Sequence, residues 1–363
     1  MRIFNYYIKI ERRSVTTPRL NALIPFVSVL ISLLIAAAVF AFQGIDPLTA
    51  YKAIFIKSFG TIKGITHIIS KLIPLLLCGV GLIISFRSNL SNIGAEGQII
   101  IGALAATWIA LYALPSVSPS IVIPCMFFLG FLAGGAWAAI PAILRIKFNV
   151  NEVISTLMMN YIAFKITEYL IYGPWKGEST WGFPQTDLFP ESVWLPMIPG
   201  TYIHYPTLVL ALSAAVLSEV LISRTKLGYE LRVFGLSPDA AKYAGISFLK
   251  VSVIAMFLSG GLAGLAGVGE IAGIHHRLRY PWAISSGYGY TAIIVAWLSR
   301  LNCLAAIPAS FMLAGLLVGG DAIQVTLRLP VNVVYIFNGL ILLCVAGGEI
   351  LTKYRVRILR KVS

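Results

Sequence analysis

The chain has 363 residues, of which 58% are hydrophobic and 12% are charged, and its mean hydropathy is +0.86. Soluble domains carry about 25% charged residues, so this composition excludes an ordinary soluble domain and predicts a polytopic membrane protein. The formal net charge is +14, but the Lys and Arg residues cluster at the ends of apolar segments. This layout is typical of topology signals and argues against nucleic-acid binding.

About ten apolar segments predict transmembrane helices, because most approach the roughly 20 residues that cross the hydrocarbon core. In chain order they are residues 21–43, 65–87, 98–114, 121–144, 152–172, 206–223, 250–271, 287–300, 303–320 and 331–350. The eighth is short and is expected to be a partial or tilted helix. The predicted fold is therefore all-α.

The organisation along the chain is a basic N-terminal segment, residues 1–20, a transmembrane domain, residues 21–350, and a basic tail, residues 351–363. When both ends are placed in the cytoplasm, most of the 28 Lys and Arg residues fall on the cytoplasmic side, as expected for inner-membrane proteins. The four Cys residues stand singly in apolar segments, so we predict no metal site and no cofactor.

Polar residues interrupt the chain between the second and third apolar segments. Asn92, Glu96 and Gln98 lie there, with Gly94 and Gly97 breaking any regular helix. Polar, non-helical backbone at membrane depth persists only where it is buried in protein or lines a cavity. The stretch therefore predicts a polar pathway for solute. An equally open alternative is that the Glu96 carboxylate caps N–H groups of the span that follows it.

The fifth segment adds two candidates for the pathway. Asn151 lies just before it and Asn160 lies about two turns inside it. Asn160 could instead be an interhelical hydrogen-bonding residue, and this alternative stays open.

Two loops are long. Residues 173–205, placed outside, carry Trp175, Trp181 and Trp194, which suit the interfacial aromatic belt or a docking surface for an external partner. Residues 224–249, placed inside, predict a short helix with Ser237 as N-cap, Pro238 in its first turn and Gly245 at its end. Such a short helix is marginal alone, so we expect it to pack against its own spans or a cytoplasmic partner.

A second interrupted stretch precedes the eighth segment, where Tyr288 and Tyr290 alternate with Gly287 and Gly289. The tyrosines are candidates for stacking on a flat ligand, with structural packing as the alternative. The two interruptions are five spans apart, which predicts two inverted five-helix halves. Paired broken helices of this kind indicate a solute site near the membrane midplane.

The sequence carries no G-x-x-x-x-G-K-[ST] motif and no arrangement of catalytic side chains, so neither ATP binding nor enzymatic catalysis is expected in this chain. Glycines recur in the seventh segment at Gly260, Gly261, Gly264, Gly267 and Gly269. Small residues at such spacing predict close helix packing.

Four stretches carry a resemblance to a known family: Asn92 to Gln98, Asn151 to Tyr161, Gly228 to Ile246, and Gly260 to Gly289. They resemble the permease subunits of bacterial ATP-binding-cassette importers for simple sugars and nucleosides, a group that includes ribose and branched-chain amino-acid permeases. The nucleoside branch is the most similar. The resemblance implies alternating access in the bacterial cell (inner) membrane, driven by a separate cytoplasmic ATPase.

The family's assembly implies three protein partners: the ATPase, a second permease subunit that is similar or identical, and an extracytoplasmic substrate-binding protein or lipoprotein. The resemblance assigns ATPase coupling to the inner loop, with candidate residues Gly228, Arg232, Ser237, Pro238, Asp239, Ala240, Ala241 and Gly245. The expected function is inward transport of a nucleoside or a related ribose-containing solute. Open alternatives are a sugar or branched-chain amino-acid substrate, an ATP-independent secondary transporter or channel, and a membrane scaffold.

Overall fold

The computed structural model describes residues 2–3, 6–12, 18–180, 182–327 and 354–360, together with residues 333, 336, 339–340, 343–344 and 347–348. The chain divides into two compact units. One is formed by residues 62–315, and the other by residues 1–61 with residues 316–363. The candidate site lies in the first unit.

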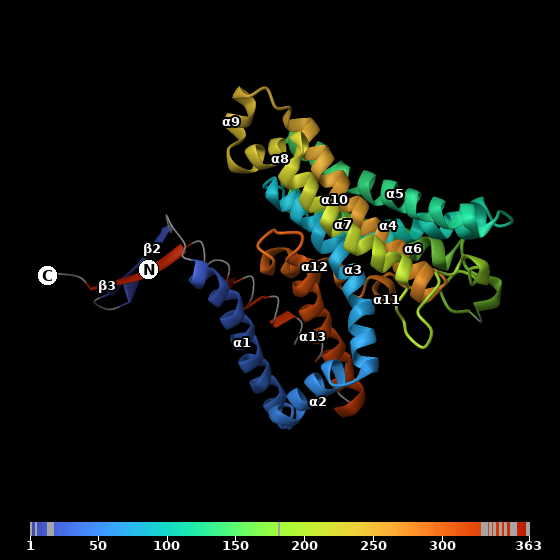
Figure 1. The fold of residues 1–363 in the computed structure, drawn as a ribbon, viewed down its shortest axis with the longest axis horizontal. Coiled ribbons are helices and arrows are strands. Elements are labelled where there is room, and N and C mark those ends of the chain that lie inside the picture. Colours follow the sequence, from blue (N-terminus) through green and yellow to red (C-terminus); the bar gives the residue numbers. More distant parts are fainter. Residues whose placement is uncertain are drawn as a thin grey trace. The chain divides into compact units, whose positions relative to one another are not determined.

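The unit formed by residues 62–315 is helical (Figure 1). Its long helices are α3 Ile62–Arg87, α4 Ala95–Trp108, α5 Pro119–Phe148, α6 Glu152–Tyr172, α7 Tyr205–Arg224 and α10 Phe248–Glu270, and π-helical turns extend α4 to Ala113 and α10 to His275. Shorter helices are α8 Lys226–Leu236, α9 Pro238–Tyr243, α11 Pro281–Ser285 and α12 Tyr288–Leu298, and α13 Ala306–Leu327 continues into the other unit.

Helix α10 is the centre of this unit and packs against α3, α4 and α5. Its glycines allow the close approach: a Cβ placed on Gly264 would lie 2.2 Å from the carbonyl oxygen of Gly130, and one placed on Gly267 would lie 1.9 Å from that of Ile99. Any side chain there would overlap backbone atoms of α5 or α4. The predicted packing role of these glycines is confirmed.

In the described part of the chain, six helices are long and apolar enough to cross a membrane. They span residues 62–87, 95–113, 119–148, 205–224, 248–275 and 306–327. Predicted spans 152–172 and 287–300 coincide with α6 and α12, but α6 is less apolar and α12 has only 11 residues. Most of the predicted span 331–350 lies outside the described residues. The all-α membrane region is confirmed, and the count of ten stays a prediction.

The other unit contains α1 Pro18–Phe42, α2 Pro47–Phe59 and a small sheet. Helix α2, absent from the predicted spans, begins because Asp46 accepts hydrogen bonds from the backbone N–H groups of Leu48 and Thr49. The sheet joins the two ends of the chain: β1 Arg2–Ile3, β2 Tyr6–Arg12 and β3 Tyr354–Arg360 pair antiparallel in that order. The sequence predicted basic segments at residues 1–20 and 351–363 but did not predict that they contain strands of one sheet.

The long loop between α6 and α7 packs on the end of α10. The backbone N–H groups of Phe189 and Leu195 donate to the carbonyls of His276 and Ala272, at 2.8 and 3.0 Å. The Trp194 ring stacks on the His276 ring with centroids 4.0 Å apart. Trp175 stacks on Tyr112 of the α4 extension, and Trp181 lies outside the described residues. Two of the three loop tryptophans therefore pack against this unit's own residues.

Candidate functional site

The first interruption is the non-helical segment between α3 and α4, and Asn92 makes most of its side-chain hydrogen bonds. Its Oδ1 accepts from the N–H of Gly94 at 2.9 Å, and its amide exchanges two hydrogen bonds with the amide of Gln98, at 3.1 and 3.0 Å. Its Nδ2 also donates to the hydroxyl of Ser259 on α10 at 2.9 Å. Because Asn92 is fully buried and Gln98 is 1% exposed, these bonds satisfy the polar groups of the break inside the protein.

Asn160 of α6 completes the support of this break. Its Oδ1 accepts from the N–H of Gly97 at 2.8 Å, while its Nδ2 donates to the carbonyl of Ile93 at 2.9 Å and to the hydroxyl of Tyr290 at 3.2 Å. The hydroxyl of Thr156 accepts from the N–H of Ile93. One amide side chain thus joins α6, the break and α12, in line with the interhelical alternative for Asn160.

Glu96 connects the first interruption to the second. Its two carboxylate oxygens accept from the N–H groups of Gly287 and Gly289, at 2.9 and 2.7 Å. The carboxylate therefore satisfies free N–H groups at the start of α12, where the helix dipole favours negative charge. A Cβ on Gly289 would lie 2.3 Å from the backbone nitrogen of Glu96. The two interruptions that the sequence placed five spans apart are in direct contact.

This contact corrects the capping alternative for Glu96. One of the two alternatives that the sequence left open was that the carboxylate caps its own helix, α4, but its hydrogen bonds go to α12. Helix α4 begins after Gly94 without a side-chain cap. The sequence alone could not identify the partner helix, because the contact is made over a separation of 191 and 193 residues.

The remaining pathway candidates separate in space. Tyr288 is 5% exposed and packs inside, whereas Tyr290 is partly exposed and bonds Asn160. Asn151 is exposed and caps α6, accepting from the N–H of Val153 at 2.9 Å. The network of Asn92, Glu96, Gln98, Asn160 and Tyr290 is thus one cluster, and Asn151 lies at the end of α6 with a local role.

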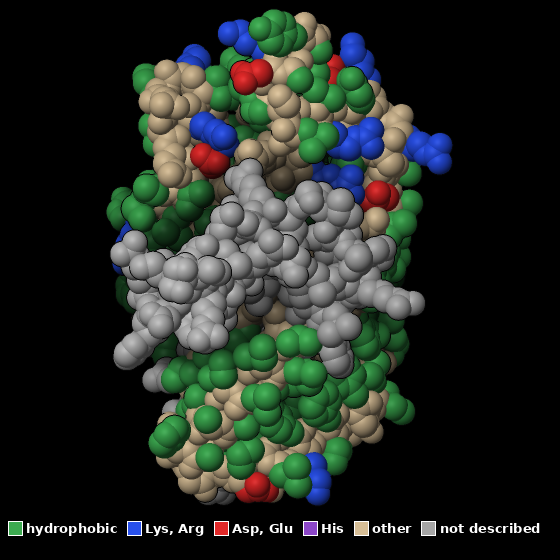
Figure 2. Space-filling model, turned by 90° about the vertical axis from the view of Figure 1, so that its left-hand side faces the viewer, with side chains coloured by type: hydrophobic (Ala, Val, Ile, Leu, Met, Phe, Trp, Pro, Cys, Tyr) green, Lys and Arg blue, Asp and Glu red, His purple; other side chains and the backbone are tan. Residues whose placement is uncertain are grey.

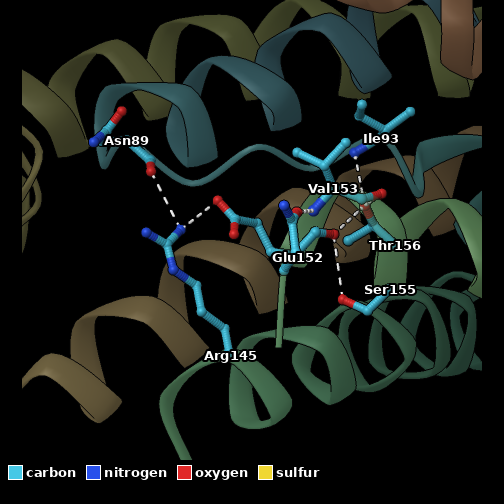
Figure 3. Close-up of polar contacts among 8 residues, drawn as sticks. Asn89, Ile93, Arg145, Glu152, Val153, Ser155 and Thr156 are labelled. Carbon is cyan, nitrogen blue, oxygen red and sulfur yellow. Dashed lines mark hydrogen bonds and ion pairs between the residues drawn. The ribbon is translucent and has the colours of Figure 1, made fainter. Parts of the chain in front are cut away.

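Arg145 is a residue that sequence reasoning assigned only to topology. Its guanidinium forms an ion pair with Glu152 at 2.5 Å and donates to the carbonyl of Asn89 at 3.4 Å (Figure 3). Figure 3 also shows the Thr156 hydroxyl beside the Ile93 N–H. Arg145 thereby joins the end of α5, the start of α6 and the start of the first break. The sequence signal for this ion pair was the seven-residue spacing of Arg145 and Glu152 across the turn at Asn149.

The loop of residues 224–249 forms the helix pair α8 and α9. The predicted short helix is confirmed: Ser237 accepts from the N–H of Ala240, Pro238 begins α9, and Gly245 has φ +72° just beyond its end. Of the coupling candidates, Gly228 and Ala241 are buried, Arg232 and Ser237 are partly buried, and Pro238, Asp239, Ala240 and Gly245 are exposed. Lys, Arg, Asp and Glu side chains gather at the top of Figure 2, the side on which Figure 1 places α8 and α9.

The exposed tip of this pair includes two large side chains, Leu236 at 87% and Tyr243 at 95% exposure. Its inner side meets the first break: a Cβ on Gly235 would lie 2.1 Å from the carbonyl oxygen of Arg87, the last residue of α3. The Arg87 guanidinium donates to the carbonyl of Leu301, just after α12, at 2.8 Å. The α8–α9 pair therefore contacts the segment that leads into the polar network.

In the described part of the chain, the other acidic side chains lie in separate contacts. Glu152 pairs with Arg145, Glu96 bonds the start of α12, and Glu270 lies 3.9 Å from His275. In the searched part of the chain, no group of three or more His, Cys, Asp or Glu side chains could hold a metal ion.

Comparison with known proteins matches residues 64–346 to the family described as "Branched-chain amino acid transport system / permease component". The chain is 35% identical to the glucose ABC transporter permease protein TsgB13 of Haloferax volcanii, over 92% of this chain and 89% of that protein. It is 32% identical to the guanosine ABC transporter permease protein NupP of Bacillus subtilis, over 90% and 94% of the two chains. It is 29% identical to the nucleoside ABC transporter permease protein NupB of Lactococcus lactis, over 68% and 70%.

These relatives are transport components of the ATP-binding-cassette class, which work with a separate ATPase and, in importers, with a substrate-binding protein. The broken helices, the α8–α9 pair and the apolar spans of this chain fit that class. The chain belongs to the branched-chain amino acid transport system permease family and is a multi-pass membrane permease of the sugar and nucleoside ABC transporter type, not an enzyme.

Proposed function

We propose that this chain is the permease subunit of an ATP-driven importer that moves a nucleoside or a related ribose-containing solute inward by alternating access. The observation that carries the proposal is the contact of Glu96 with the N–H groups of Gly287 and Gly289. Broken helices that meet at membrane depth are typical of solute sites in transporters built from inverted repeats. Two inverted five-helix halves, about ten spans in all, remain part of this proposal.

In the proposed assembly the α8–α9 pair docks on the ATPase. Its exposed Leu236 and Tyr243 are large apolar side chains at a charged surface, which suits an interface with a buried centre and a polar rim. A second permease subunit completes the pathway, and an extracytoplasmic binding protein or lipoprotein delivers the solute. The chain lies in the cell (inner) membrane with both termini in the cytoplasm.

Two alternatives differ in substrate or in energy source. A sugar substrate is favoured by the relative named as a glucose permease, which is 35% identical. An ATP-independent secondary transporter would need a relay of ionisable groups in the membrane. Glu96, Glu152 and Glu270 each have a different partner, which favours the importer.

Uptake into proteoliposomes tests the proposal. The liposomes would contain this chain with its co-purifying partners and binding protein, and uptake of radiolabelled guanosine, glucose and leucine would be measured with ATP or with a non-hydrolysable analogue. We expect guanosine uptake that requires hydrolysable ATP. Uptake of glucose alone would support ATP-driven import but would show that the substrate is a sugar and not a nucleoside. Uptake that is equal with the analogue would refute ATP-driven import.

The proposed docking surface can be tested in the same preparation. Tyr243→Asp places a charge on a side chain that is 95% exposed and has no role in packing, so we expect the permease to fold and lose its ATPase on purification. Lys250→Gln is the control, because Lys250 is exposed at the start of α10 and is not one of the coupling candidates. Retention of the ATPase by Tyr243→Asp would place the docking surface elsewhere.

A further inference from the structure

Helix α6 carries a stripe of polar and aromatic side chains on its exposed face. Tyr161, Lys165, Glu168 and Tyr172 follow one another at spacings of four, three and four residues, which places them on one side of a helix. Tyr161 is 58% and Tyr172 is 63% exposed, and the Lys165 side chain is 77% exposed. The Lys165 ammonium pairs with Glu168 at 2.7 Å.

The depth of this stripe makes a lipid-facing role costly. Helix α6 has 21 residues, so at 1.5 Å per residue Lys165 lies about 10 Å from its end and Tyr161 lies near its middle. Charged side chains at such depth usually face a water-filled cavity or other protein. Exposed apolar side chains lie outside the stripe, as expected for contact with lipid: Val209, Val216 and Leu217 on α7, and Ile162 and Ile166 on α6.

Aromatic residues from another part of the chain continue the stripe. Trp282 packs against Phe164 of α6 and lies beside Tyr290, with ring centroids 5.6 and 6.5 Å apart. Tyr280 is close enough to Lys165 for an electrostatic interaction, and so is Tyr161 to Tyr290.

We call this surface the aromatic wall and define it as Tyr161, Lys165, Tyr172, Tyr280, Trp282 and Tyr290. Tyr280 and Trp282 are 45% and 46% exposed. The wall adjoins the polar network directly, because the Tyr290 hydroxyl accepts from Asn160.

We propose that the aromatic wall lines the aqueous pathway and that the nucleobase of the transported solute stacks on it. The inference rests on the proposed function and deepens it by naming the surface that the solute contacts. Aromatic rings stack on any base, and this stacking corresponds to about 5- to 150-fold in affinity per base. Solute is favoured over a second permease as the occupant, because an exposed Lys is depleted at the centre of protein interfaces.

Cysteine labelling of the assembled transporter tests the position of the wall. The four native cysteines, Cys78, Cys125, Cys303 and Cys344, are replaced by Ala. Tyr161→Cys is then compared with Ile166→Cys, a position that is 36% exposed on another side of the same helix. A water-soluble methanethiosulfonate reagent should modify Tyr161→Cys and leave Ile166→Cys unmodified. Protection of Tyr161→Cys in the complex, with labelling of the isolated permease, would show that a second permease covers the face and would overturn the proposal.

Solute contact is tested by protection and by uptake. Guanosine should slow the labelling of Tyr161→Cys, and Tyr161→Ala should raise the KM for guanosine about 5- to 150-fold, while Tyr161→Phe keeps it near the wild-type value. Labelling that guanosine leaves unchanged, or slowing by glucose alone, would overturn the nucleobase contact. Labelling needs no ATP, so failure of ATP dependence in the wild type would refute the importer without affecting this result.

Discussion

Replacement of Asn160 by Ala is the most direct test of the network that joins the two broken helices. The Asn160 amide is the partner of the Gly97 N–H and the Ile93 carbonyl, and Asn160 is 1% exposed. Asn160→Ala removes this amide, and both backbone groups lose their hydrogen bond to it. An unsatisfied buried donor or acceptor costs about 1–3 kcal/mol, so we expect a loss of about 2–6 kcal/mol in the free energy of unfolding.

Asn151→Ala is the matched control, because it removes an Asn from the exposed start of the same helix. Loss of an N-cap costs about 1 kcal/mol. Hydrogen bonds between membrane helices average about 0.6 kcal/mol, because the unfolded helices find other partners. The hydrogen bonds of Asn160 should each contribute more than this average, because their partners are backbone groups that a helix break leaves free of other bonds.

The assay is thermal unfolding in detergent, followed with a dye that fluoresces on reaction with thiols. Cys78 and Cys303 are buried, so the dye reports their exposure. Asn160→Ala should melt at a clearly lower temperature than Asn151→Ala. Asn160→Asp keeps an acceptor for the Gly97 N–H but places a buried carboxylate against the Ile93 carbonyl oxygen, so it should melt no higher than Asn160→Ala. Equal melting temperatures for Asn160→Ala and Asn151→Ala would refute the role assigned to the network.

Three further predictions follow from the same contacts. Glu96→Gln has one acceptor oxygen for the two N–H groups at the start of α12, so uptake should fall while the ATPase still co-purifies; wild-type uptake would contradict this. Gly235→Ala places a Cβ 2.1 Å from the Arg87 carbonyl, and such overpacking costs about 1–3 kcal/mol, so uptake per ATP hydrolysed should fall; an unchanged ratio would exclude this contact from coupling. The Ser179 hydroxyl, which donates to the Asp187 carboxylate, lowers the pKa of that loop carboxyl below its usual 3.8. Its folded-state pKa is below the unfolded value, so its stabilising contribution is fully present above about pH 4 and is lost as the pH falls through the folded pKa. Ser179→Ala should therefore destabilise the protein at pH 6 and make less difference at pH 3, measured by thermal unfolding, and an equal difference at both would exclude this linkage.

Both ends of α12 are bonded to residues that flank the first break. Glu96 bonds the start of α12 and Arg87 bonds the carbonyl of Leu301 just after its end. Residues Arg87 and Glu96 flank the first break, so the break and α12 are joined at both ends. Because Gly235 of α8 packs on Arg87, a displacement of α8 would reach both broken helices through one contact.

The sequence alone determined the class of the protein and the location of its unusual segments. Long apolar segments have few stable environments besides a membrane, and glycines beside Asn, Glu and Gln interrupt helices locally, so the breaks around Asn92 and Gly287 could be predicted without a fold. The capped helix at Ser237–Gly245 was predictable for the same reason, since its start and end depend on residues within one or two turns.

Only the tertiary structure decided which groups meet. Glu96 caps α12 and not its own helix, Tyr288 is buried while Tyr290 is partly exposed, and Arg145 bonds the break. The sequence could not supply these results, because a hydrogen bond over 191 residues depends on the packing of several helices around the glycines of α10. Periodicity shows which residues share a face of α6, but which face stays exposed is set by the neighbours that cover the others.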